Sequence, residues 1–173
     1  MSFKQEKIIN FLNDFYNLGL SLEELTEFVL QFGTDICFLL HNQKAIVKGI
    51  GEIIEPINLD IKQKVLIINP NIKIETKYIY NKVKEISHTL LYKEYIYEND
   101  ILKILENDLE RVVFEEFNEM RKLYNELNDV LDNVHMSGSG STMYSLIESH
   151  QEQLIKDLKN KYPNYLIDIY NVK

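Results

Sequence analysis

The chain has 173 residues, 45% of them apolar, and a formal net charge of −8 at pH 7, so we expect one sizeable core and no second independent domain. The acidic balance argues against nucleic acid or an anionic membrane as the main partner. A lone cysteine, Cys37, excludes a disulfide framework, and neither a charged-then-apolar leader nor a membrane-length apolar run is seen, so we expect a cytoplasmic protein.

Two helices are predicted at the start of the chain. Apolar residues recur at helical spacing over residues 8–16, and Gly19 is a typical helix stop. Ser21 and Glu24 then form a capping box, and the apolar helix face that follows closes at Gly33. The first part of the chain is therefore expected to be helical.

The next part of the chain is predicted to be sheet. Short apolar or β-branched runs cover residues 36–40, 45–47, 53–57 and 65–68. The glycines at 49 and 51 predict a hairpin turn between two of these strands. Asp35 lies just before the first run, at a corner where a carboxylate would meet a substrate, although such a residue is usually a solvated turn residue.

Helices and strands alternate in the remainder of the chain. Helical spacing returns over residues 79–86, 101–105, 113–131 and 154–158, and a strand over 166–170 closes the chain. Thr76 is predicted to cap the helix that carries Tyr80, a tyrosine at core spacing. The acidic residues of 107–110 suit the dipole at the start of the long helix. This mixture of helices with antiparallel strands predicts an α+β domain.

A loop rich in glycine and serine lies between two apolar, alternating segments near residue 140. The alternation predicts two strands, so backbone N–H groups and hydroxyls of the loop would converge on one anion such as phosphate. A plain glycine-rich hairpin turn is the alternative, and no Walker motif is present. The candidate phosphate-binding residues are Ser137, Gly138, Ser139, Gly140 and Ser141.

Taken in order, six motifs resemble the later two-thirds of a small-molecule kinase of the GHMP family. They are LGLSLEEL (18–25), FGTDICFLL (32–40), KGIGEIIEPI (48–57), INPN (68–71) with Thr76 after it, NDLE (107–110) and MSGSGSTMYSLIE (136–148). The resemblance implies a ferredoxin-like C-terminal domain over 45–173, an antiparallel sheet with helices. It implies that residues 1–44 are the last helices of the family's ATP-binding domain.

The resemblance also implies roles for individual residues. Asp35 matches the catalytic aspartate, the loop 137–141 matches the motif close to the reacting phosphate, and Thr76 and Tyr80 match positions that line a cytidine pocket. The implied reaction is transfer of phosphate from ATP, with its Mg²⁺, to the 2-hydroxyl of a cytidine diphosphate-linked polyol in non-mevalonate isoprenoid biosynthesis. No cluster of histidine, cysteine and carboxylate residues has metal-ligand spacing, so no protein-bound metal is expected.

Met1 and Ser2 align with the end of the family's glycine-rich ATP motif, so the phosphate loop and catalytic lysine upstream of it have no counterpart here. We therefore expect a truncated or split kinase, inactive alone, that forms a homo-oligomer or binds a complementing amino-terminal polypeptide. The alternative is a non-catalytic nucleotide- or protein-binding module of the same ancestry, which has no chemical reason to keep Asp35. A GHMP kinase for another small alcohol is the third hypothesis.

Overall fold

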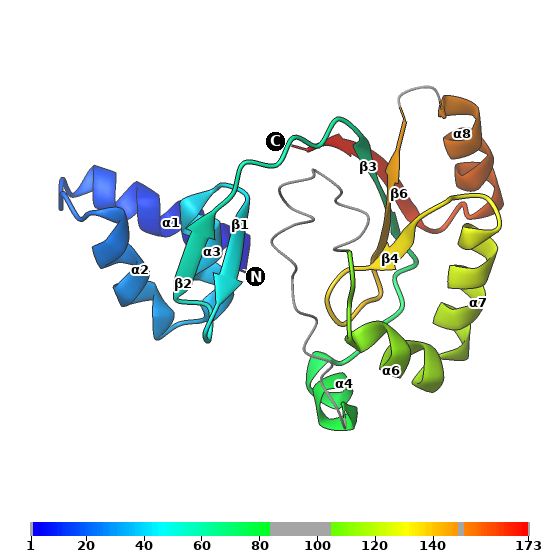
Figure 1. The fold of residues 1–173 in the computed structure, drawn as a ribbon, viewed down its shortest axis with the longest axis horizontal. Coiled ribbons are helices and arrows are strands. Elements are labelled where there is room, and N and C mark those ends of the chain that lie inside the picture. The colour runs from blue at the N-terminus through cyan, green and yellow to red at the C-terminus, as the bar shows by residue number, and fades with distance from the viewer. Residues whose placement is uncertain (1, 84–104, 149–150, 173) are drawn as a thin grey trace. The chain divides into compact units, whose positions relative to one another are not determined.

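The computed structural model describes residues 2–83, 105–148 and 151–172 (Figure 1). The chain divides between Leu59 and Asp60 into two compact units. Each unit has a hydrophobic core of its own, where the length of the chain had predicted a single core. The assignment of residues 1–44 and 45–173 to two domains of the family stays a prediction.

The first unit consists of three helices and a two-stranded hairpin. Its elements are α1 (Ser2–Phe15), α2 (Leu22–Leu30), α3 (Thr34–His41), β1 (Ala45–Lys48) and β2 (Ile53–Pro56). The predicted capping box is confirmed, because Glu24 N–H donates to Ser21 Oγ at 3.2 Å and Ser21 N–H donates to the Glu24 carboxylate at 2.8 Å. The predicted hairpin turn between β1 and β2 is also confirmed.

The prediction of a strand over residues 36–40 is wrong, because these residues belong to helix α3. An unbroken apolar run of this length has no alternation, so its sequence does not separate a strand from a buried helix. The structure buries Ile36, Cys37 and Leu40, which is the spacing of one helix face, against Leu25 and Val29 of α2. Tertiary packing therefore decides the conformation here.

The second unit is a four-stranded antiparallel sheet with helices packed on it. Its elements are β3 (Lys64–Asn69), α4 (Thr76–Lys82), α6 (Leu109–Glu116), α7 (Asn118–Asn128), β4 (Val134–Met136), β5 (Met143–Ile147), α8 (Glu152–Lys161) and β6 (Leu166–Asn171). The strand order is β4-β5-β3-β6. This order, with helices between β3 and β4 and between β5 and β6, is the ferredoxin-like arrangement, and the predicted α+β class is confirmed.

The core of the second unit lies between the sheet and its helices. Leu66 and Ile68 alternate on one face of the central strand β3 and are fully buried. They share a cluster with Leu127 of α7 and Leu158 of α8. Burial of one sheet face in this way fixes the register of β3, since a shift by one residue would turn its apolar side chains outward.

The single long helix predicted over residues 113–131 is interrupted. Phe117 has extended backbone angles (φ −120°, ψ 91°) and separates α6 from α7. The Arg121 Nε donates to Phe114 O at 2.8 Å, which satisfies a carbonyl that the interruption leaves without a helical partner. Apolar spacing continues through the break, so periodicity alone could not reveal it.

Two of the predicted helical stretches fall partly outside the described residues, namely 84–86 of the first and 101–104 of the second. The predicted helix over 154–158 and the strand over 166–170 are confirmed as α8 and β6. Among the residues that the structure describes, no helix is long and apolar enough to cross a membrane.

Candidate functional site

The predicted strand-loop-strand around Gly138 is confirmed, and the loop connects β4 to β5. Ser137 N–H donates to Thr142 O at 2.9 Å, and Gly140 N–H donates to Ser137 O at 3.0 Å. Gly138 and Gly140 have φ angles of +56° and +82°, which favour glycine at both positions. Two glycines therefore make a tight turn that exposes backbone groups at the end of the sheet.

Thr76 meets this loop across a hydrogen bond. The Thr76 Oγ1 lies 2.8 Å from Ser139 Oγ, although the two residues are 63 positions apart. Thr76 is the first residue of α4, and its hydroxyl bonds to the loop instead of capping the helix as predicted; Glu75 occupies the cap position. Two residues that the sequence analysis assigned to different parts of one substrate site are thus in contact.

Tyr80 lies one helical turn after Thr76 and is 61% exposed. The core spacing noted in the sequence therefore belongs to its neighbour Ile79, which is fully buried. An exposed aromatic ring one turn from the residue that bonds to the loop offers a flat face on which a base can stack. Tyr80 has the exposure that the predicted pyrimidine contact requires.

A cavity of about 440 Å³ adjoins the loop. It lies between the segment 69–75 and residues 140–142, and Lys73 and Glu75 bring charges of both signs to its wall. Asn69 Nδ2 donates to Thr142 Oγ1 at 3.1 Å, which joins the end of β3 to the far end of the loop. The loop, the start of α4 and this cavity form the candidate site.

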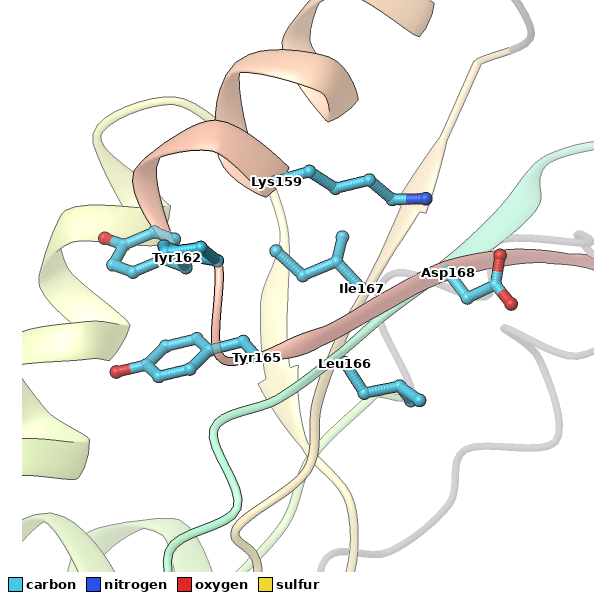
Figure 2. Close-up of a pocket in the computed structure, with 7 residues that line it drawn as sticks. Lys159, Tyr162, Tyr165, Leu166, Ile167 and Asp168 are labelled. Atoms are coloured by element: carbon cyan, nitrogen blue, oxygen red, sulfur yellow. The ribbon is translucent and has the colours of Figure 1, made fainter.

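A second hollow, of about 350 Å³, lies where α8 turns into β6. Figure 2 shows Tyr162 and Tyr165 with their rings side by side at one end and Asp168 at the other. The two rings are stacked, with centroids 4.9 Å apart. None of the residues predicted from the sequence as site residues lines this hollow.

Asp35 lies in the first unit, away in sequence from the residues just described. It is exposed and belongs to the first turn of α3, so the prediction of an exposed corner holds although the following strand is a helix. The structure brings Thr76 and Ser139 into contact in the second unit, whereas Asp35 belongs to the first unit. Among the described residues, no group of three or more His, Cys, Asp or Glu could hold a metal ion.

Glu110 and Asn107 contact the loop, and sequence reasoning gave neither of them a role at it. The Glu110 carboxylate accepts the Met136 N–H at 2.6 Å. Burial raises the pKa of Glu110 above its usual value, and this hydrogen bond opposes the shift. Burial and the charge of Glu110 also raise the pKa of Tyr144. The only sequence feature that could have indicated these two contacts is the NDLE motif, whose acidic residues were assigned to the helix dipole.

We expect Gly140→Ala to disrupt the loop and Gly138→Ala to be much milder. A Cβ at Gly140 would lie 2.8 Å from the Sδ of the buried Met136, whereas a Cβ at Gly138 meets nothing within 4 Å. Both positions have positive φ, so both variants carry the backbone cost of roughly 1–2 kcal/mol. Thermal unfolding should show the larger loss for Gly140→Ala, and equal losses would contradict this account.

Comparison with known proteins identifies relatives of this chain. Residues 93–164 match the family described as "GHMP kinases C terminal". A protein of Thermoanaerobacter pseudethanolicus (strain ATCC 33223 / 39E) named 4-diphosphocytidyl-2-C-methyl-D-erythritol kinase is 35% identical over 162 residues, 87% of this chain and 56% of that protein. A protein of the same name from Thermoanaerobacter sp. (strain X514) is 37% identical over 158 residues, 86% of this chain and 54% of that protein.

The fold is similar to that of a solved structure described as "Crystal structure of 4-(cytidine 5'-diphospho)-2C-methyl-D-erythritol kinase". The TM-score is 0.73 at 22% identity, with 97% of this chain and 63% of that chain covered. The chain spans about half the length of the curated relatives that it matches. The sequence matches show that the chain belongs to the GHMP kinase family and carries that family's C-terminal domain.

Proposed function

We propose that the chain takes part in the ATP-dependent phosphorylation of the 2-hydroxyl of 4-diphosphocytidyl-2-C-methyl-D-erythritol, the substrate in the relatives' printed name. The observation that carries the proposal is the Thr76–Ser139 hydrogen bond of 2.8 Å. It places a residue implied to contact the cytidine moiety beside the loop implied to contact phosphate. One extended ligand with a base at one end and phosphate along its length fits that arrangement.

The proposal gives each group a task that its chemistry allows. Tyr80 stacks on the cytosine ring, and Thr76 hydrogen-bonds the same part of the substrate. The loop from Ser137 to Ser141 offers hydroxyl and backbone N–H donors to phosphate oxygens. Asp35 accepts the proton of the attacking hydroxyl or orients it. When bound, ATP supplies the phosphoryl group and its Mg²⁺ offsets negative charge on the phosphates; the loop's donors suit such an anion.

We further propose that residues 1–173 by themselves transfer phosphate slowly or not at all, and that full activity needs a counterpart of the remaining half of the relatives. That counterpart, or a second copy of the chain, would cover exposed apolar side chains of the first unit. A cytoplasmic location belongs to the same proposal, supported by a single cysteine, Cys37, that is buried and unpaired.

We expect the purified chain to bind CDP and Tyr80→Ala to weaken that binding. Loss of one base-aromatic stacking contact, worth roughly 1–3 kcal/mol, corresponds to a fall in affinity of about 5- to 150-fold. Isothermal titration calorimetry measures both affinities. Tyr170→Ala is the matched control, because Tyr170 is also an exposed tyrosine, on strand β6, and its hydroxyl bonds to Asp168.

The proposed substrate is wrong if the folded chain does not bind CDP, or if Tyr80→Ala and Tyr170→Ala weaken binding equally. CDP binding without phosphoryl transfer, even when a counterpart of the unmatched half of the relatives is present, would favour a binding module of kinase ancestry.

A further inference from the structure

Asn107 binds two main-chain carbonyls of the loop with one side-chain nitrogen. Its Nδ2 donates to Met136 O and to Gly138 O, each at 2.8 Å. Its Oδ1 accepts the Leu109 N–H at 3.0 Å. Two acceptors face the nitrogen and a donor faces the oxygen, so only this orientation of the amide satisfies all three contacts.

These contacts determine the direction of a backbone N–H in the loop. In a trans peptide the N–H points opposite to the C=O of the preceding residue. Gly138 C=O points at Asn107, so the Ser139 N–H points away from Asn107. The same geometry applies two residues earlier, where Met136 C=O faces Asn107 and the Ser137 N–H donates to Thr142 O on the other side.

A third hydrogen bond connects residues 107–110 to the start of the loop. Glu110, one turn further along, accepts the Met136 N–H at 2.6 Å. Met136 is almost fully buried, so its main-chain groups have no water to bond and depend on Asn107 and Glu110. Both polar main-chain groups of Met136, the last residue of β4 before the loop, are therefore bound by the side chains of Asn107 and Glu110.

We propose that Asn107 is a positioning residue of the phosphate loop. Asn107 binds the Met136 and Gly138 carbonyls, whose oxygens would repel an anion, and so keeps them directed away from the ligand. It also directs the Ser139 N–H toward the phosphate. Glu110 anchors the same segment from the adjacent N–H. The inference rests on the proposed function, because it takes the loop to bind a phosphate of the substrate.

The test compares two ligands that differ in phosphate alone. Asn107→Asp replaces the donating nitrogen with an oxygen that faces the Met136 and Gly138 carbonyls. Repulsion between these oxygens should change the orientation of the loop's peptide groups. We expect calorimetry to show CDP affinity falling about tenfold or more, the effect of one hydrogen bond to a charged group, while cytidine affinity stays within about twofold. Asn125→Asp makes the same chemical change at an exposed position of α7 and should alter neither affinity.

A second variant and a measurement on the unmodified chain make the test independent of folding defects. Asn107→Ala removes the donor without placing an oxygen against the carbonyls, and it should show the same selective loss of CDP affinity. By NMR, the side-chain amide protons of Asn107 should exchange with water more slowly than those of Asn125. The Ser139 amide resonance should shift with CDP in the unmodified chain and not in either variant of Asn107.

The inference is overturned if both Asn107 variants retain the preference for CDP over cytidine, or if the Asn107 amide exchanges as fast as that of Asn125. It is also overturned if CDP and cytidine affinities fall together, because a general structural defect affects both. Failure of the unmodified chain to bind either ligand counts instead against the proposed function, and the exchange measurement distinguishes the two cases.

Discussion

Asparagine in place of Asp35 is expected to abolish phosphoryl transfer and to leave the fold intact. The side chain is exposed in the first turn of α3, so an isosteric amide costs little stability. If Asp35 receives or orients the proton of the attacking hydroxyl, its loss should lower kcat by about 10²- to 10⁴-fold. CDP affinity should change by less than about twofold, since ground-state binding does not need this carboxylate.

Because full activity is proposed to need a counterpart, the activity assay uses a chimera. It joins residues 1–173 to the part of the Thermoanaerobacter pseudethanolicus kinase that they do not match. Asp14→Asn is the matched control, because Asp14 is another exposed aspartate of the first unit, in α1. Residual activity of Asp35→Asn above a tenth of the unmodified chimera would remove Asp35 from the catalytic role. Full activity of unfused residues 1–173 would instead contradict the proposed need for a counterpart.

Purified residues 1–173 are expected to associate through aromatic side chains of the first unit. Five of these side chains are between 52% and 64% exposed, namely Phe11, Phe15, Tyr16, Phe28 and Phe32. Phe11 stacks on Phe15 and Phe28 lies edge-on to Phe32, each pair at 5.4 Å between centroids. Exposed aromatic surface of this kind favours association. Light scattering should therefore give a mass above the 20.5 kDa of one chain.

The double variant Phe15→Lys with Phe28→Lys should return the mass to that of one chain. Ile50→Lys tests specificity, because Ile50 is a large exposed apolar residue of the same unit, at the hairpin turn, and is 69% exposed. We expect Ile50→Lys to leave the mass unchanged. A monodisperse monomer without any substitution would show that these aromatic residues do not drive association at the concentrations used.

Sequence predicted those elements whose ends are set by local chemistry. The capping box of Ser21 with Glu24 fixes the start of α2 through neighbouring atoms, and the glycines at 49 and 51 fix the turn between β1 and β2. The alternation on both sides of Gly138 predicted β4 and β5, and the first three residues of each strand alternate between buried and partly exposed. In each case the residues that decide the structure lie within a few positions of one another.

The elements that sequence mispredicted depend on distant partners. Helix α3 forms because its apolar face packs on α2, and the break at Phe117 has no glycine or proline to mark it. The Thr76 hydroxyl does not cap its helix but hydrogen-bonds to Ser139, a residue 63 positions away. Of the candidate site, the chemistry-bearing residues were predicted through family resemblance, whereas the contacts of Asn107 and Glu110 became visible only in three dimensions.

The position of β3 at the centre of its sheet has a consequence for synthesis on the ribosome. β3 pairs with β5 on one side and with β6, which ends at Asn171, on the other. One edge of β3 therefore stays unpaired until β5 is translated, about 75 residues later, and the other edge stays unpaired until β6 is translated, about a hundred residues later. An open, apolar strand edge invites pairing with other chains. The nascent chain should depend on holding chaperones more than an equally stable protein of local topology.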